Sequence, residues 1–255
     1  YTASKVAVKK VRLKEDDDGD CDASKKDLLI EFELMRDMSH PNLMRVLDLY
    51  ACDKKLYFVT DYAARGDLTG FITSPEKVDE RWIAGVVRQV LAACAFLHRR
   101  CIVHHDVKPA NVLMTDVPLQ RTQVAVSVVL LADFGLSQTE HFVANESRKT
   151  AGAGNGTPCY MPPESAKGFS GPKTDAYAIG IMLYELLSGG FAPDPIIDDG
   201  EVADVDWTLL GRCTADASNT TKDLIAPSVG DRLSCQDALQ LDWFWRIVQT
   251  SACDS

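Results

Sequence analysis

The sequence predicts an α+β fold in which a small, strand-rich N-terminal part precedes a larger, mainly helical part. Residues 1–60 combine one helical stretch, about Ser24–Met38, with three short strand-like runs. These runs are Lys5–Val11, Met44–Tyr50 and Leu56–Thr60. Glu80–Arg100 then carries apolar residues at helical spacing, which is typical of a long helix in a core. At 255 residues the chain has the size of one catalytic domain.

The composition excludes several classes of protein. A hydrophobic content of 46% and a charged content of 25% are those of an ordinary globular protein. No apolar stretch is long enough to span a membrane. The net charge of −10 argues against nucleic acid as the main partner and suits a basic protein substrate.

Between the long helix and the next strand-like run lies the most informative segment, His104–Asn111, which reads His-His-Asp-Val-Lys-Pro-Ala-Asn. Asp133-Phe134-Gly135 follows, with Asp133 placed 22 residues after Asn111. Phosphoryl transfer requires a carboxylate that receives a hydroxyl proton and oxygen ligands that hold magnesium against the phosphates. This segment and Asp133 supply both kinds of group.

Further motifs stand in a fixed order on either side. Val6-Ala-Val-Lys9 is a short apolar strand that ends in lysine, and Glu31 follows 22 residues later. Downstream, Gly156–Glu164 reads Gly-Thr-Pro-Cys-Tyr-Met-Pro-Pro-Glu, and Asp175-Ala-Tyr-Ala-Ile-Gly and Arg232 come after it. Spacings of 29 residues from Glu31 to Thr60 and of 46 from Thr60 to Asp106 complete the series.

Together these motifs cover nearly the whole chain and resemble those of the eukaryotic protein kinases. Lys108, two residues after Asp106, is similar to the serine/threonine subgroup. The resemblance implies a two-lobed kinase fold over residues 1–255, with the N-lobe at 1–60, the hinge at 61–66 and the C-lobe at 67–255. It also implies that Asp175 binds the backbone around His104.

The resemblance assigns the chemistry to particular residues. Asp106 is expected to receive the proton of the substrate hydroxyl, and Lys108 to offset charge on the migrating phosphoryl group. Asn111 and Asp133 are expected to hold Mg²⁺. An ion pair between Arg232 and Glu164 is expected as well.

The nucleotide site that the resemblance implies is larger. Lys9, held by Glu31, is expected to bind the phosphates of ATP. Thr60 is similar to a small gatekeeper residue beside the adenine site. The remaining residues expected to contact the nucleotide are Asp61, Ala63, Asp67 and Leu113. Asp67 can contact the ribose, or it can cap the helix that follows.

Two positions depart from the family pattern. Only five residues precede Val6, so the glycine-rich loop that covers the phosphates in kinases is missing from the sequence. Either the chain begins after that loop or the protein does without it, as in a small group of apicomplexan parasite kinases. His105 stands where the family has arginine, and histidine binds phosphate more weakly. We therefore expect activity without phosphorylation at Thr150, Thr157 or the neighbouring serines, whether His105 acts in regulation or only packs.

Longer connections are also expected. The chain between Asn111 and Asp133 exceeds the family length and contains the strand-like run Val124–Leu131, which predicts an enlarged hairpin. Leu136–Pro163 is expected to form a long activation segment, with flexible glycines at its centre.

The sequence thus predicts an ATP- and Mg²⁺-dependent serine/threonine kinase that acts on protein. The alternative is a pseudokinase that keeps the fold as a scaffold or regulatory binding protein. Eight scattered cysteines without a Cys-x-x-Cys pair favour free thiols in a reducing compartment such as the cytoplasm. A secreted parasite effector stays open as the other location.

Overall fold

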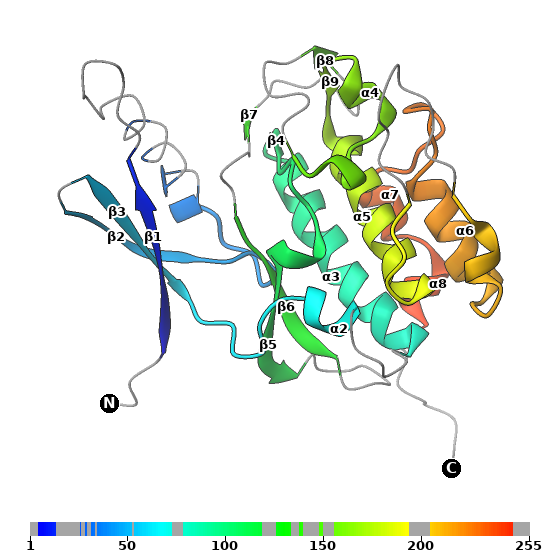
Figure 1. Cartoon of the computed structure of the whole chain (residues 1–255), viewed down its shortest axis with the longest axis horizontal. Coiled ribbons are helices and arrows are strands. Elements are labelled where there is room, and N and C mark those ends of the chain that lie inside the picture. The colour runs from blue at the N-terminus through cyan, green and yellow to red at the C-terminus, as the bar shows by residue number, and fades with distance from the viewer. Residues whose placement is uncertain are drawn as a thin grey trace.

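A small antiparallel sheet and a larger helical lobe, joined through the segment after residue 61, make up the computed structural model of the chain (Figure 1). This two-lobed arrangement confirms the predicted α+β fold. The structure describes these residues: 5–13, 26, 29, 32–33, 35–52, 54–72, 79–118, 126–133, 138–139, 148–149, 156–193 and 205–246.

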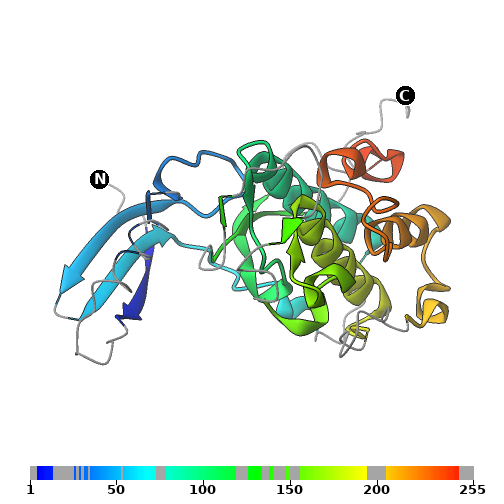
Figure 2. The same cartoon turned by 90° about the horizontal axis from the view of Figure 1, so that it is seen from above.

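Three antiparallel strands in the order β1-β3-β2 form the sheet of the small lobe. They are β1 (Val6–Arg12), β2 (Val46–Cys52) and β3 (Lys55–Asp61). All three overlap the runs predicted from the sequence. The central strand β3 buries Leu56 and Phe58, since alternate residues of a strand point to one face. In Figure 2 the long strands of this sheet extend away from the helical lobe.

The helical stretch predicted at about Ser24–Met38 falls only partly within the described residues. The described positions that are helical there are Lys26, Leu29, Phe32, Glu33, Met35 and Arg36. Met35 and Met38 are buried and belong to the main core, so this stretch packs its apolar side inward.

Two long helices, α3 (Glu80–His98) and α5 (Pro172–Ser188), pack against each other in the core of the large lobe. The Asp79 side chain caps α3 by accepting a hydrogen bond from Arg81 N, as is typical of a helix start. Gly180 of α5 lies against Ile225, so close that a Cβ there would be 2.5 Å from Ile225 Cγ2. The observed helix α3 starts at the predicted residue Glu80 and ends two residues before the predicted end at Arg100, so the prediction of this helix is confirmed.

A hairpin of β5 (Val112–Pro118) and β6 (Ser127–Leu131) lies beside α3 (Figure 1). Asn111 directly precedes β5, and Asp133 follows two residues after the end of β6. The strands are antiparallel, which confirms the hairpin predicted here. Gln89 of α3 fixes β6, because its amide donates to Ser127 O and accepts from Val129 N.

Short elements complete the large lobe. Two pairs of short strands are antiparallel: β4 (Ile102–Val103) with β7 (Gln138–Thr139), and β8 (Arg148–Lys149) with β9 (Phe169–Ser170). The remaining helices are α2 (Thr69–Ile72), α4 (Pro163–Ala166), α6 (Ala215–Leu224), α7 (Cys235–Ala238) and α8 (Asp242–Trp245). Short 3-10 turns occur at Pro109–Asn111, Pro158–Tyr160 and Trp207–Leu210.

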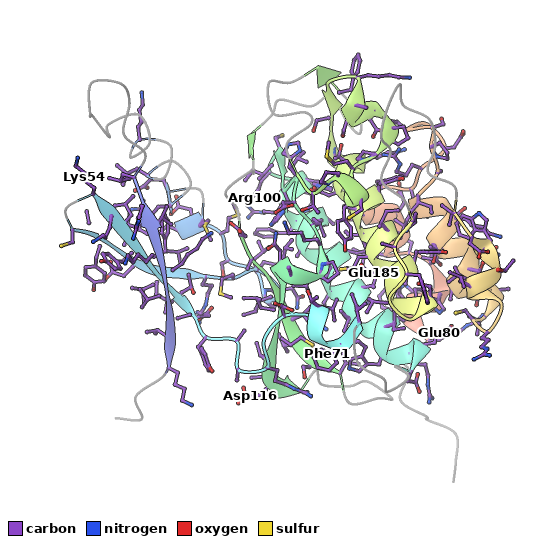
Figure 3. All side chains as sticks on the ribbon, viewed as in Figure 1. Lys54, Phe71, Glu80, Arg100, Asp116 and Glu185 are labelled. Atoms are coloured by element: carbon purple, nitrogen blue, oxygen red, sulfur yellow. The ribbon has the colours of Figure 1, made fainter. Side chains whose placement is uncertain are left out.

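Polar side chains tie the C-terminal elements to the rest of the lobe. Arg232, fully buried, donates to both Glu164 oxygens at 2.6 and 3.0 Å, which confirms the predicted pair. Glu80, at the start of α3, accepts hydrogen bonds from Trp243 Nε1 and Thr214 Oγ1 (Figure 3). No helix within the described part of the chain has the length and apolar character needed to cross a membrane.

Candidate active site

An open cleft of about 490 Å³ separates the sheet from the β5–β6 hairpin. The small lobe contributes strand residues from β1, β2 and β3, and the large lobe contributes residues around Asn111 and Asp133. The lining residues are Ala7, Val8, Lys9, Val11, Met35, Met44, Val46, Phe58, Thr60, Ala110, Asn111, Leu113, Ala132 and Asp133. The cleft has apolar walls and a charged inner end, which suits a ligand with a flat ring and phosphates.

Lys9 and Asp133 form the charged end of this cleft. Lys9 Nζ lies 2.8 Å from Asp133 Oδ1, and both side chains are about half exposed, at 54% and 43%. Asp133 has a left-handed backbone, with φ of 65°, which turns its carboxylate away from the direction of strand β6. Glu31, the expected partner of Lys9, lies outside the described residues.

Asp106 lies beside the cleft residue Asn111 and accepts hydrogen bonds from neighbouring side chains. Lys108 Nζ is 2.8 Å from Asp106 Oδ2, and Asn111 Nδ2 is 2.9 Å from the same oxygen. Asn111 also donates to Asp106 O. These contacts follow from the turn at Pro109–Asn111, which brings Asn111 back over Asp106.

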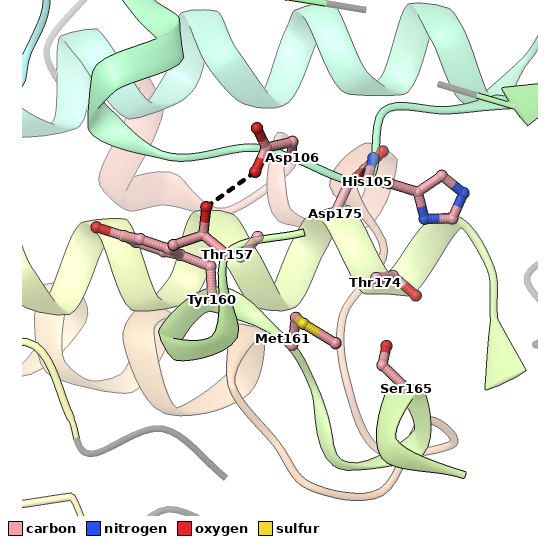
Figure 4. Close-up of a pocket in the computed structure, with 9 residues that line it drawn as sticks. His105, Asp106, Thr157, Tyr160, Met161, Ser165, Thr174 and Asp175 are labelled. Carbon is pink, nitrogen blue, oxygen red and sulfur yellow. Dashed lines mark hydrogen bonds between the residues drawn. The ribbon is translucent and has the colours of Figure 1, made fainter. Parts of the chain in front are cut away.

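Thr157 connects this group to the segment before α4. Its hydroxyl accepts from Lys108 Nζ at 2.8 Å and donates to Asp106 Oδ1 at 3.1 Å, the bond drawn in Figure 4. The Asp106 carboxylate is therefore contacted by Lys108, from its own segment, and by Thr157, which lies 49 residues after Lys108 in the sequence. Sequence reasoning treated Thr157 only as a phosphorylation site, although its place in the Gly-Thr-Pro motif could have indicated a structural role.

His104 joins the catalytic segment to the strand that leads to Asp133. Its Nδ1 accepts from Asp106 N, so Nε2 carries the proton and donates to Ala132 O at 3.1 Å. Burial lowers the pKa of His104 and keeps the ring neutral. A neutral ring with both nitrogens engaged joins the backbone of Asp106 to that of Ala132, the residue before Asp133.

Asp175 of α5 holds the catalytic segment from below. Its carboxylate accepts from His104 N and His105 N, both at 2.9 Å, which confirms the predicted contact. His98 Nε2 lies 2.8 Å from the same carboxylate. Burial opposes the charge on Asp175, but the hydrogen bond and charge of His98 outweigh it and lower the Asp175 pKa to about 2.

His105 is buried beneath the catalytic segment and has a left-handed backbone with φ of 66°. Its Nδ1 lies 3.3 Å from Ser170 Oγ, and its ring lines a small cavity of about 10 Å³ with Thr174 and Met161 (Figure 4). Burial lowers its pKa, so the ring carries no charge to offer a phosphate at neutral pH. These contacts favour the packing role for His105.

Only some of the residues predicted to contact the nucleotide line the cleft. Lys9, Thr60 and Leu113 line the cleft, and so do Asn111 and Asp133, which were predicted to hold Mg²⁺. Thr60 pairs with Ala7 across the sheet, which places its small side chain at the inner wall.

Three other predicted residues do not line it. The Asp61 carboxylate forms a bidentate pair with Arg45 at 2.8 and 2.9 Å. Asp67 Oδ1 accepts from Thr69 N and so caps α2, the alternative that the sequence left open. Ala63, in the connection between the lobes, is half-buried.

Several cleft residues were not predicted. Met44, Ala110 and Ala132 have no reactive side chain, and of the three only Ala110 lies within a motif, so only their neighbours in sequence could have indicated them. Met44 N bonds to Leu131 O, which places the small lobe directly against the strand before Asp133.

The donor groups at the inner end of the cleft fit a hard cation. Asp133 offers carboxylate oxygens, and Asn111 turns its amide nitrogen to Asp106, so its amide oxygen faces away from Asp106. Within the described ranges no three His, Cys, Asp or Glu side chains are grouped for a metal ion. Two protein ligands are nevertheless enough where phosphate oxygens complete the coordination of Mg²⁺.

Comparison with known sequences agrees with this geometry. A family model described as "Protein kinase domain" matches residues 1–244. The chain belongs to the protein kinase family. Kinases of this family generally use ATP together with Mg²⁺. The cleft of this kinase domain, with Lys9, Asn111 and Asp133 at one end, lies where the family motifs meet.

Individual relatives of this kinase domain come from plants, parasites and animals. It is 28% identical over 234 residues to CBL-interacting serine/threonine-protein kinase 7 of Arabidopsis thaliana, covering 88% of the chain and 51% of the relative. It is 29% identical over 253 residues to calcium-dependent protein kinase 4 of Plasmodium berghei, covering 95% of the chain and 44% of the relative. It is 35% identical over 191 residues to serine/threonine-protein kinase pak-1 of Caenorhabditis elegans, covering 74% and 30%. The kinase domain thus spans about half the length of these relatives, or less.

Proposed function

We propose that this chain transfers the γ-phosphate of ATP to a serine or threonine hydroxyl of a protein. The observation that carries the proposal is the environment of Asp106, whose carboxylate contacts Lys108, Thr157 and the cleft residue Asn111. The names of the relatives, which include several serine/threonine kinases, support the class of acceptor.

In this mechanism Asp106 accepts the hydrogen bond of the acceptor hydroxyl and receives its proton as the phosphoryl group moves. Lys108 lies 2.8 Å from Asp106 and provides a positive charge at the point where negative charge develops. The hydroxyl of Thr157 holds both groups in register. When bound, Mg²⁺ supplies charge neutralisation at the phosphates, and Asn111 and Asp133 would hold it.

The other end of the cleft binds the nucleotide in this proposal. Lys9 contacts the phosphates and leaves its ion pair with Asp133 when the metal and nucleotide enter. Thr60, Leu113 and the backbone of Asp61 and Ala63 contact the adenine, and Asp67 lies near the ribose while it caps α2. The net charge of −10 supports a protein substrate with basic residues.

The test is Mg²⁺-dependent transfer of labelled phosphate from ATP to protein, measured for the wild type and for Asp106→Asn, Asp133→Asn and Lys9→Met. We expect each variant to lose roughly a hundredfold or more in kcat/KM, as for the loss of a general base or an electrostatic group. Thermal unfolding of each variant, with and without Mg²⁺ and ATP, separates loss of chemistry from loss of folding.

A pseudokinase scaffold gives a different pattern. Equal phosphate transfer by the wild type and all three variants would show that the signal comes from a contaminant and would contradict the proposal. ATP binding without transfer by the folded wild type would also contradict it.

A further inference from the structure

A second open groove lies behind the connection between the lobes and takes no part in the proposed mechanism. Its volume of about 440 Å³ is close to that of the cleft described above. Residues of both lobes line it. Those that give the groove its charge and its aromatic surface are Lys5, His40, Arg45, Asp61, Tyr62 and Asp116. We call it the rear groove.

The rear groove and the cleft share a wall. Arg45 and Asp61 face the rear groove, whereas their neighbours Val46 and Thr60 line the cleft. Asp61 N donates to Arg45 O, which holds the two segments side by side. Because successive residues of an extended chain point to opposite faces, the groove and the cleft lie on opposite sides of this wall. A ligand in the rear groove therefore contacts both lobes without entering the cleft.

The small-lobe wall of the rear groove offers positive charge and hydrogen-bond donors. Lys5 Nζ lies 5.8 Å from the centroid of the Tyr62 ring. Arg45 binds Asp61 through Nε and Nη2, at 2.8 and 2.9 Å, so its Nη1 can donate to a ligand. His40 Nδ1 accepts from a backbone N–H, so Nε2 carries the proton and is a donor as well. The pair of Arg45 and Asp61 is neutral as a whole, so Lys5 gives this wall its net positive charge.

The large-lobe wall is acidic. The register of β5 and β6 shifts after Met114, where Thr115 Oγ1 accepts from Val117 N and donates to Val128 O. This bulge directs Asp116 out of the strand ladder, at the lower end of β5 in Figure 3. The Asp116 carboxylate is exposed and forms no ion pair with any residue that the structure describes.

The opposite charges of the two walls select a particular kind of ligand. An extended peptide presents successive side chains to opposite sides. A peptide in which acidic and basic residues alternate therefore places its carboxylates at Lys5 and Arg45 and its cations at Asp116. Tyr62 and Val117, at the edges of the groove, are 45% and 55% exposed and add apolar contact area. Because the groove is open to solvent, a longer chain can enter at one end and leave at the other.

We propose that the rear groove is a docking site for an extended segment of a partner protein in which acidic and basic residues alternate. The bound segment spans both lobes and the connection between them. This docking is independent of phosphate transfer, so its test does not rest on the proposed function.

The experiment uses two capped peptides of eight residues as probes. One alternates glutamate and lysine, and the other has four glutamates followed by four lysines, so length, composition and net charge are the same. Each is titrated into the folded, ¹⁵N-labelled chain, and the amide signals are followed by NMR. We expect the alternating peptide to bind roughly tenfold more tightly and to shift the signals of residues 39–45, 61–62 and 115–117.

Reversed charges locate the contact. Lys5→Glu and Asp116→Lys should each weaken binding of the alternating peptide roughly tenfold, because each places like charges together. The double variant should recover most of the affinity, because a slip of the peptide by one residue turns every side chain to the other wall. Lys167→Glu changes an exposed lysine outside the groove and should bind as the wild type does.

Four results would contradict the proposal. The alternating peptide could fail to bind at millimolar concentration, or both peptides could bind equally, which would leave only an effect of composition. The signals that shift could belong to the cleft instead of the rear groove. The single variants could lose binding without recovery in the double variant, which would contradict the arrangement of the two walls.

Discussion

At the scale of single residues, Asp106 is held by donors from three different positions, and the Thr157 hydroxyl is the one that reaches it from another element. Thr157→Val keeps the side-chain shape but removes both the bond to Asp106 and the bond to Lys108. We expect kcat to fall roughly tenfold to a hundredfold with little change in the KM for ATP, because the nucleotide contacts are elsewhere. Steady-state kinetics with varied ATP and a fixed protein substrate measure both values.

Serine supplies the control for this change. Thr157→Ser keeps the hydroxyl and should retain most of the wild-type kcat. A valine variant as active as the serine variant would show that the hydroxyl of Thr157 has no part in placing Asp106.

Asp175 gives the molecule a specific dependence on pH. Its folded pKa of about 2 lies below the 3.8 of an unperturbed aspartate. The unfolded chain therefore binds this proton first as pH falls, so the stabilisation is complete above about pH 4 and is lost as pH falls toward 2. The amount is roughly 2 kcal/mol for the ionised carboxylate.

The comparison with Asp175→Asn isolates this carboxylate from the other acidic groups. The variant should be less stable than the wild type at pH 6, and the difference in unfolding free energy should shrink as pH falls from about 4 to about 2. Urea unfolding at several pH values measures it. A difference that stays constant over this range would mean that the charge of Asp175 contributes nothing.

The contacts that could be predicted from the sequence were those that the family motifs imply. The resemblance to protein kinases implied the contact of Asp175 with the backbone at His104 and the pair of Arg232 with Glu164, and the structure has both. The side chains of Asp61 and Asp67 were harder, since each had several partners in reach. In the structure the Asp61 carboxylate is bound by Arg45, and the Asp67 carboxylate accepts a hydrogen bond from Thr69 N. Only the folded arrangement decides between such partners.

At the scale of secondary-structure elements, the contact between α5 and α6 depends on a residue without a side chain. A Cβ on Gly180 would lie 2.5 Å from Ile225 Cγ2 and 2.8 Å from Leu224 Cβ. Gly180→Ala should therefore destabilise the chain by about 1–3 kcal/mol, because α6 must move away from α5. The free energy of unfolding in urea provides the measurement.

Gly70 of α2 offers a matched control, because no atom lies within 4 Å of the position of its Cβ. Gly70→Ala should be neutral or stabilising by up to about 1 kcal/mol, since alanine restricts the unfolded chain. Equal effects at both glycines would show that α5 and α6 do not pack as closely as described.

A second comparison of elements concerns two ion pairs. Arg232 and Glu164 are 0% and 11% exposed and join the last part of the large lobe to α4, whereas Arg246 and Asp216 are 69% and 41% exposed. Glu164→Gln should cost about 3–5 kcal/mol, because the buried guanidinium loses its counter-charge. Asp216→Asn should cost less than about 1 kcal/mol, because solvent screens the exposed pair.

Thermal unfolding of the two variants tests this difference. A Glu164→Gln variant with the melting temperature of Asp216→Asn would contradict a structural role for the buried pair. Arg232 also donates to Ala226 O, Lys173 O and Pro227 O, so its replacement should cost more than that of Glu164.

At the scale of the whole molecule, the net charge of −10 should act on the approach of substrates. The KM for a peptide rich in lysine and arginine should rise severalfold when salt increases from about 0.05 to about 0.5 M, because ions screen the attraction. A peptide of the same length with glutamine at those positions should change by less than about twofold. The same salt dependence for both peptides would remove the electrostatic argument for a basic substrate.

The two lobes were predictable from the resemblance to protein kinases, but the cleft between them was predictable only in part. Lys9, Asn111 and Asp133 belong to motifs of reactive groups, and they meet at one end of the cleft. Met44 and Ala132 have ordinary apolar side chains, and a sequence contains nothing that separates a cleft wall from any other core position.

The left-handed backbone at His105 has a consequence for laboratory evolution. Within the described ranges only Cys101, His105 and Asp133 combine a side chain with positive φ, and two of them adjoin the proposed chemistry. Such a conformation costs roughly 1 kcal/mol or more for a residue with a Cβ, and glycine adopts it freely. Glycine at position 105 would relieve this strain but would also remove a buried ring that contacts Ser170, a loss of roughly 2–5 kcal/mol. Selection for heat resistance alone should therefore retain His105 despite its backbone strain.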